Sequence, residues 1–400
     1  MAAAPGHDSP SGEAPGAGAL LLLFSGVNLL IGSAAFMSTG LLEPMAESLG
    51  TSVAAVGQTT TVYAVATAVL APVVLTVTGR LSRRAALGAV FAVFTLGNLL
   101  TTLAPDLPTL LVARLLMGAG SATTALMAGL TVGLVAPDRR ARALSVVFLG
   151  ISLSYVTGVP LAAWVGLGWG WRVPAAIATV LCALATVMLW RSVPGERQPD
   201  APSPLAGMGA LLRDARLRQV YSLTFIYFVA IFSVFAYVGP MLADLVPMER
   251  AGLSASISVF GVAGVVGTLL GGRAADRLGP RRTILGGLAC LAGSLALLPL
   301  TRGHAWVMMP VVMVWGAAGF CLMAPQQLRI ARFAGPQTPL ALSLNSSVLY
   351  LGTAAGAALG GAALVRLDAG DLPWVGAPVA VLAWGWAWWS VREGPARPHG

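Results

Sequence analysis

Charge, lysine and cysteine are scarce in this 400-residue chain. Only 10% of its residues are charged, lysine is absent, and 57% are hydrophobic. A soluble domain carries about 25% charged residues, so this composition excludes an ordinary soluble fold. The mean hydropathy of +0.81 indicates a protein embedded in a membrane.

The same scarcity removes several classes of function. The net charge of +9 does not indicate nucleic-acid binding, because the arginines are scattered between apolar runs and not gathered on one face. The three cysteines, Cys182, Cys290 and Cys321, lie inside apolar runs, where they predict packing residues and not disulfides. No glycine run is followed by lysine, so a phosphate loop for ATP is excluded. We expect no cofactor, no metal and no nucleic-acid partner.

Apolar runs long enough to cross a bilayer recur along the chain. A hydrocarbon core about 30 Å thick takes ~20 residues of helix. Backbone groups have no partner in lipid, and continuous apolar runs exclude the alternating pattern of barrel strands, so these runs predict helices. The twelve predicted spans are 18–42, 53–78, 85–104, 107–135, 143–167, 171–190, 220–243, 253–271, 283–300, 305–326, 340–365 and 373–390.

The spans divide the chain into two similar parts. We expect six-helix bundles over 18–191 and 220–391, with disordered cytoplasmic tails over 1–17 and 392–400. Between the bundles, a proline-rich stretch is followed by LLRDARLRQ, which predicts a linker over 192–219 that ends in a short helix at the membrane surface. A solvated tether is the alternative interpretation.

Arginine placement gives the orientation. Nineteen of the 24 arginines lie on the side that also holds both termini, four lie on the other side (Arg172, Arg250, Arg302 and Arg366), and Arg114 lies inside a span. The positive-inside rule therefore predicts a multi-pass protein of the cell membrane with both termini in the cytoplasm.

Two arginine-rich loops mark a repeat. GGRAADRLGPRRTILGG begins at Gly271, and a shorter echo, TGRLSRRAALG, begins at Thr78, almost half a chain earlier. Each loop joins the second span of its half to the third. A duplicated six-span unit predicts this spacing, and such internal symmetry is typical of secondary transporters.

The second of these loops resembles the loop signature of the major facilitator superfamily. The resemblance implies an all-α membrane fold with 12 transmembrane helices in two pseudo-symmetric six-helix bundles, and a gating role for the loop. Asp276 is able to pair with a nearby arginine, which makes a breakable latch, and the glycines allow a tight turn. The residues assigned to this latch are Gly272, Arg273, Asp276, Arg277, Gly279, Arg281 and Arg282, with Arg80, Arg83 and Arg84 in the first half.

The sequence departs from the family signature in three ways. Ala274 replaces a leucine, Pro280 replaces a basic residue, and the first-half copy lacks the aspartate. That shortened copy, together with STGLLEPMAESLGTS, TGVPLAAWVG and GWGWR, resembles the drug- and sugar-efflux branch of the family. This resemblance implies alternating-access, proton-linked efflux of a drug, sugar or related metabolite by a monomer.

Small residues recur every four positions in two spans, which places them on helix ridges. The residues are Gly150, Ser154 and Gly158 in the fifth span, with Pro160 breaking the hydrogen-bond ladder, and Gly352, Gly356 and Gly360 in the eleventh. Small ridges allow close helix approach, so we expect both helices to face a moving boundary between the halves. Ordinary tight packing is the alternative.

Arg114 is the one charge well inside a span, and an ionisable group at that depth is a functional hypothesis. The segment RLLMGAG resembles the family's fourth-helix motif, which implies that Arg114 holds a proton-linked partner or a substrate acceptor group. Ala35 stands where relatives have a first-helix glutamate, and Glu43 is the nearest candidate partner. An arginine satisfied by backbone carbonyls is the alternative.

A binding cavity between the halves should combine rings, amides and hydroxyls in an apolar wall. The candidates are Asn28, Tyr63, Tyr227, Tyr237, Trp315, Phe320, Asn345 and Tyr350. They suggest a moderately apolar organic substrate. The spans carry no facing His, Asp or Cys groups, which argues against an intramembrane enzyme. An uncoupled facilitator and a non-transporting sensor on the same fold remain alternatives.

Overall fold

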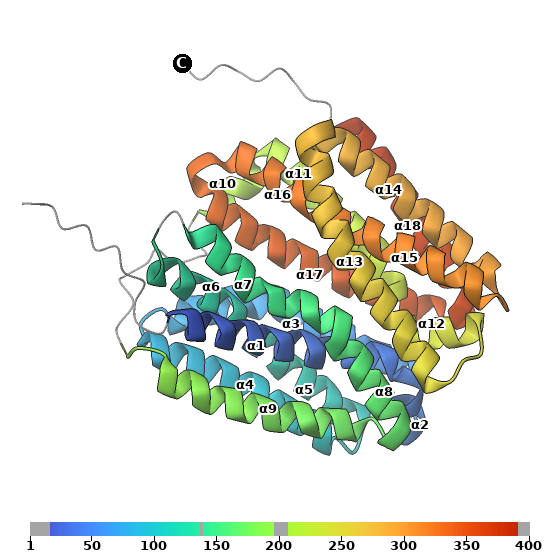
Figure 1. The fold of residues 1–400 in the computed structure, drawn as a ribbon, viewed down its shortest axis with the longest axis horizontal. Helices are drawn as coiled ribbons and strands as arrows, with labels where there is room; N and C mark the ends of the chain where they lie inside the picture. The colour runs from blue at the N-terminus through green and yellow to red at the C-terminus, as the bar shows by residue number, and fades with distance from the viewer. Residues whose placement is uncertain (1–16, 137–138, 196–206, 391–400) are drawn as a thin grey trace, which may run out of the picture.

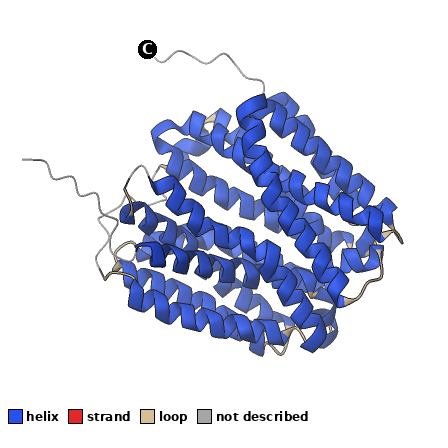
Figure 2. Cartoon of the chain, in the orientation of Figure 1, coloured by secondary structure: helices blue, strands red, loops and turns tan. Residues whose placement is uncertain are grey.

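The structure is a computed structural model that describes residues 17–136, 139–195 and 207–390. Within those ranges the chain consists of helices and loops, without strands (Figure 2). Helices satisfy the backbone groups that lipid leaves unpaired, and the predicted all-α fold is confirmed. The predicted tails, apart from Ala17, and residues 196–206 of the linker lie outside the described residues.

The first half contains the elements from α1 to α9. They are α1 (Ala17–Phe36), η1 (Met37–Gly40), α2 (Leu42–Ser48), α3 (Val53–Thr78), α4 (Arg83–Leu103), α5 (Leu107–Gly120), α6 (Thr123–Leu134), α7 (Arg140–Leu153), η3 (Ser154–Gly158), α8 (Val159–Trp169) and α9 (Arg172–Ser192).

The second half follows the linker helix α10 (Met208–Arg213). Its elements are α11 (Ala215–Phe235), α12 (Val238–Leu245), α13 (Arg250–Leu278), α14 (Pro280–Leu297), η4 (Leu298–Thr301), α15 (Ala305–Cys321), α16 (Met323–Ala334), η5 (Gly335–Gln337), α17 (Thr338–Ala363), η6 (Ala369–Asp371) and α18 (Pro373–Ser390).

Ten segments of the described residues are long and apolar enough to cross a membrane. One of them, Ala305–Ala363, has 59 residues and would be roughly 88 Å long as one helix, so it holds two crossings. The chain reverses at η5, where Gly335 has φ +52°. The tryptophan-rich α18, with 18 residues, completes the twelve predicted spans.

The two halves touch most closely at one end. Element α13 of the second half contacts α8 and η3 of the first half extensively and α7 only slightly, and α3 packs along α17. In Figure 1, α13 passes close to α8 near α2 and α12 and diverges from α7 toward its other end. We call the end formed by η1, α2, α8 and α12 the closed end.

The small-residue ridges allow close approach within each half. Gly150 lies against the Ser25 carbonyl of α1, and Gly356 lies against Val229 and Ser233 of α11. The other ridge positions follow the same pattern: Ser154 contacts Gly32, Gly158 contacts Ser33, Gly352 contacts Phe225 and Phe228, and Gly360 contacts Ser233 and Tyr237. Both spans do meet the other half, since η3 and α8 contact α13 and α17 contacts α3, but the small-residue ridges themselves pack against partners in their own half.

The predicted break near Pro160 takes a specific form. Residues Ser154–Gly158 form one π-helical turn, and α8 begins at Val159. Proline has no N–H to donate, and the wider turn before it absorbs the interruption. The turn carries Tyr155, which contacts the second half.

The arginine-rich loop and the linker are set by local chemistry. Gly279 has φ +81°, where a side chain is strained, so the predicted tight turn is confirmed. Pro280 follows at the start of α14, a position where its missing N–H costs nothing. The linker contains the short helix α10, and LLRDARLRQ divides between α10 and α11. Asp214 ends α10, and its carboxylate caps α11 by accepting the N–H groups of Arg216 and Leu217 at 2.7 and 3.2 Å.

We predict that Gly356→Ala destabilises the protein by about 1–3 kcal/mol, the usual cost of overpacking. The added Cβ would lie 2.8 Å from the Val229 carbonyl oxygen and 2.9 Å from the Ser233 nitrogen, so α11 would have to move. The matched control is Gly286→Ala in α14, where no atom lies within 4 Å. Thermal unfolding in detergent should show a lower midpoint for Gly356→Ala alone; equal midpoints would contradict the packing role.

Candidate functional site

Aromatic rings from both halves meet at the centre of the boundary. Phe36 lies 5.9 Å from Phe232, and Tyr155 lies 5.6 Å from Phe320, measured between ring centroids. We define the aromatic boundary cluster as Phe36, Tyr63 and Tyr155 of the first half with Phe232, Phe235, Phe320 and Tyr350 of the second. Its members come from α1, α3, η3, α11, α15 and α17, so six separate elements position it.

Three predicted cavity residues belong to this cluster. Tyr63 of α3 and Tyr350 of α17 face each other across the boundary, with centroids 6.3 Å apart and rings nearly perpendicular. Phe320 packs edge-on against Tyr155. Trp315 lies behind the cluster, fully buried, with its centroid 4.5 Å from that of Phe260. Edge-to-face ring pairs contribute about 0.5–1.5 kcal/mol beyond burial.

Other predicted cavity residues serve other contacts. Asn28 donates to the Val147 carbonyl at 2.9 Å and accepts from Thr124 at 2.7 Å, which joins three helices within the first half. Tyr227 pairs with the neighbouring Phe228 ring at 4.8 Å.

Two further candidates lie in different settings. Asn345 is buried, and its amide oxygen has no hydrogen-bond partner among the described residues. Tyr237 lies at the closed end and not in the cluster.

Sequence reasoning missed Phe36, Tyr155, Phe232 and Phe235. A signal existed for the last two, because Phe228, Phe232 and Phe235 follow helical spacing on one face of α11. No comparable run of rings marks Phe36 or Tyr155, since the nearest other rings of their spans are Phe24 and Phe148.

Arg114 is fully buried beside the end of α1. Its Nη1 donates to the carbonyls of Ala34 and Ala35 at 3.0 and 3.1 Å. These carbonyls lie in the last turn of α1, where a positive charge complements the helix dipole. Its Nε and Nη2 have no hydrogen-bond partner in the described part of the chain. One edge of the guanidinium therefore caps a helix, and the rest retains donor capacity.

The predicted pairing of Arg114 with Glu43 is wrong. The chain turns through η1 before α2, so Glu43 lies exposed in the first turn of α2. The carbonyls of α1 occupy the place that a carboxylate would take.

The closed end is held by direct contacts between the halves. Gly239 of α12 lies against the backbone of Thr39 and Gly40 in η1, so close that a Cβ would lie 3.0 Å from the Thr39 oxygen. The Tyr237 hydroxyl donates to the Ala357 carbonyl at 2.9 Å and accepts from the Gln58 amide of α3 at 3.4 Å.

A cation–π clasp lies at the same end. Arg250, the first residue of α13, places its guanidinium carbon 5.0 Å from the Trp164 ring and 5.4 Å from the Trp169 ring, both in α8. The two indoles are themselves 5.3 Å apart and nearly perpendicular. One arginine of the second half therefore contacts two rings of the first half.

The opposite end carries the predicted latch residues. Asp276 is exposed and forms no ion pair with any residue in the described ranges. Arg281 lies over the Trp388 ring at 5.5 Å, and Arg84 donates to the Val193 carbonyl at 2.9 Å. The remaining latch residues, Arg80, Arg273, Arg277 and Arg282, are exposed, and Arg83 is half-buried.

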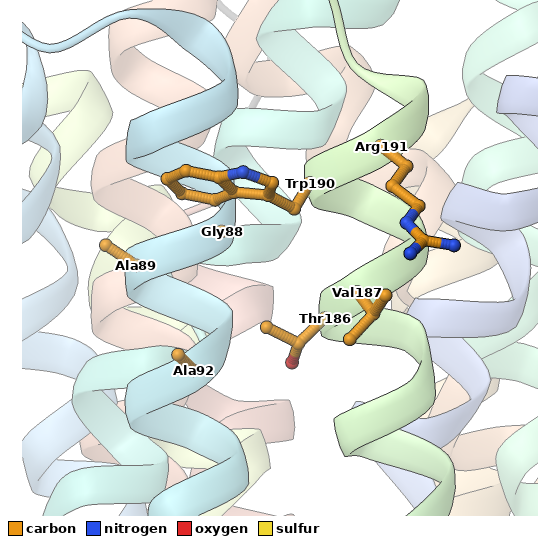
Figure 3. A pocket seen from close by; sticks show the side chains of 7 residues that line it. All are labelled: Gly88, Ala89, Ala92, Thr186, Val187, Trp190 and Arg191. Carbon is orange, nitrogen blue, oxygen red and sulfur yellow. The ribbon is translucent and has the colours of Figure 1, made fainter.

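A surface groove of about 310 Å³ lies on the first half, away from this boundary. It is lined by Gly88, Ala89 and Ala92 of α4 and by Thr186, Val187, Trp190 and Arg191 of α9. Figure 3 shows Trp190 reaching from α9 across Gly88. Because every lining residue belongs to one half, movement between the halves would not open or close this groove.

We predict that Arg250→Gln loosens the closed end. A cation–π contact contributes about 0.5–2 kcal/mol, so the population with this end open should rise about 2- to 30-fold. Glu47 and Asp368 are exposed positions at this end in different halves. Spin labels attached at Glu47→Cys and Asp368→Cys would report the change as a longer label-to-label distance in double electron–electron resonance.

The matched control is Arg302→Gln. Arg302 lies at the same end, but its partners Asp244 and Asp371, at 3.3 and 3.0 Å, belong to its own half. An equal shift in both variants, or no shift in Arg250→Gln, would contradict the clasp.

Comparison with known proteins agrees with this arrangement. The chain is 31% identical over 367 residues to the inner membrane transport protein YdhP of Escherichia coli, covering 91% of this chain and 94% of that protein. It is 28% identical to a probable sugar efflux transporter of Mannheimia succiniciproducens, covering 88% of each.

Solved structures give the same fold. A crystal structure of a bacterial homologue of the human lysosomal transporter Spinster superposes with a TM-score of 0.78 at 16% identity, covering 96% of this chain and all of that one. The family model of the Major Facilitator Superfamily matches residues 22–337 and 248–400. The chain is therefore a transporter, not an enzyme, and belongs to the Major Facilitator Superfamily.

Proposed function

We propose that this transporter exports a small organic molecule by alternating access, acting as a monomer. The observation that carries the proposal is the aromatic boundary cluster, where rings of both halves meet at the centre of the molecule. Rocking of the halves would part these rings and expose their faces to a substrate. The efflux transporters among the similar proteins support the direction.

Both termini lie in the cytoplasm in this proposal. The arginine-rich ends of the helices then face the cytoplasm, and the closed end faces outward. Asp276, which has no ionic partner in the described part of the chain, then lies on the cytoplasmic side, where the halves are apart. In the opposite state it would pair across the cytoplasmic side, and the outer clasp of Arg250 would open.

The substrate is a moderately apolar molecule such as an amphiphilic drug, a sugar or a related metabolite. The cluster offers ring faces and the hydroxyls of Tyr63, Tyr155 and Tyr350. The unpartnered Nε and Nη2 of Arg114 add donors for an acceptor group. A small-molecule site usually has an apolar wall with a few polar groups.

We propose proton-linked antiport as the coupling. An uncoupled facilitator is the second candidate, and one observation supports that second candidate. Arg114 binds helix carbonyls, and the acids of the described residues lie at the ends of the spans. Sensitivity of the flux to an uncoupler separates the two.

The orientation is tested with fusions. Green fluorescent protein becomes fluorescent when it folds in the cytoplasm and not when it is exported unfolded. Fused to the C-terminus, it should therefore fluoresce. Alkaline phosphatase, which is active only outside the cytoplasm, should be active when inserted at Pro247, in the loop between α12 and α13. The reverse pattern would overturn the orientation.

The function is tested by flux of labelled amphiphilic antibiotics and sugars in transporter-deficient cells, with and without an uncoupler. Tyr155→Leu should weaken apparent affinity by up to about tenfold, because one ring contact contributes about 0.5–1.5 kcal/mol. The control is Phe91→Leu, a buried ring stacked on Phe94 inside the first half at 5.7 Å. Asp276→Asn should slow the cycle without changing affinity. Identical flux in Tyr155→Leu and wild type would remove the boundary cluster from the site.

A further inference from the structure

The second half carries a groove that the transport proposal does not use. It has a volume of about 530 Å³ and lies between α11, α17 and α18. Its walls include Phe225 and Ile226 of α11, Val348 and Leu351 of α17, and Trp386 of α18. None of its lining residues belongs to the first half.

The walls lie at the depth of the hydrocarbon. Phe225 and Val348 are each ten residues from the starts of α11 and α17, which is about 15 Å along the helix. Phe225 and Leu351 remain 37% and 40% exposed. Apolar surface at this depth is in contact with lipid chains, so an acyl chain is the natural occupant of the groove.

The mouth of the groove is positively charged and fixed in place. Arg218 lines it, and its Nη1 donates to the carbonyls of Leu212 and Arg213 at 3.4 and 2.8 Å, the last carbonyls of α10. Arg213 and Arg216 are exposed on the same turn of chain, whereas Asp214 is engaged in capping α11. The local charge therefore remains positive beside an apolar channel.

Trp386 completes the groove at the level of the mouth. Its indole Nε1 donates to the Gln219 carbonyl of α11 at 3.3 Å, which holds the ring across the gap between α18 and α11. Tryptophan with an anchored N–H is typical of the interface between headgroups and chains. The groove thus presents a hydrocarbon channel, an interfacial ring and a guanidinium in the order in which a phospholipid presents its chain, glycerol and phosphate.

We propose that this groove binds one anionic phospholipid from the leaflet at the arginine-rich end, with an acyl chain along Phe225, Ile226 and Leu351 and its phosphate on Arg218. Guanidinium and phosphate form charge-assisted hydrogen bonds, and a lipid with net negative charge also benefits from Arg213 and Arg216. The bound lipid would tie the linker helix α10 to α17 and α18.

Native mass spectrometry of the full-length protein released from nanodiscs tests this site. The discs contain equal parts phosphatidylglycerol and phosphatidylcholine. Wild type should retain one phosphatidylglycerol in preference to phosphatidylcholine. Arg218→Gln should lower that retention about fivefold, the share of one basic side chain near a membrane surface. Equal retention of the two lipids by wild type would overturn the proposal.

Two paired variants separate the groove from general attraction. Arg282→Gln removes an exposed arginine at the same end of the molecule but outside the groove, and should leave retention unchanged. Val348→Trp fills the channel and should abolish it, whereas Leu269→Trp, at a 56% exposed position on α13, should not. Equal loss in Arg218→Gln and Arg282→Gln, or full retention in Val348→Trp, would show lipid held by diffuse charge and not by the groove.

Discussion

Backbone contact at glycine within each half is the constraint on which the rest of the structure depends. Gly150 meets the α1 backbone at Ser25, and Gly356 meets the α11 backbone at Val229 and Ser233. In lipid there is no hydrophobic force between helices, so close van der Waals packing of this kind holds a bundle together. Each half can then behave as a rigid unit, as the alternating access proposed above requires.

The surface between the halves adds ring contacts at its centre to the glycine contact of Gly239 with Thr39 and Gly40 at the closed end. Rings from six elements meet there, and ring pairs attract one another in offset-stacked as well as edge-to-face arrangements. Separating two rings leaves no buried donor or acceptor without a partner, whereas separating buried ion pairs would leave uncompensated charge. The bonds of Arg114 Nη1 to α1 stay inside the first half, so the proposed movement of the halves would not break them.

The sequence predicted features that depend on neighbouring residues alone. The twelve spans follow from hydropathy, and the turn at Gly279 follows from the one residue that tolerates its φ. It could not predict which neighbour a helix face meets: Gly150 and Tyr155 lie in the same span, yet one packs inside its half and the other crosses the boundary. The sequence offered backbone carbonyls as the alternative partners of Arg114, and the structure has them at Ala34 and Ala35. It could not say which carbonyls, because every residue possesses one and no pattern marks them.

The π-helical turn at Ser154–Gly158 fixes the length of the fifth span as well as its shape. An i→i+5 turn holds one residue more than an α-turn, so the bulge adds a residue to the span while α8 keeps nearly the rotational phase of a continuous helix. That phase places Ala163 against Gly40, and Trp164 and Trp169 against Arg250. An α-helix advances about 100° per residue, so a residue added to α8 outside the bulge would turn these side chains away from their partners. The widened turn is therefore the part of the span that tolerates a change in length.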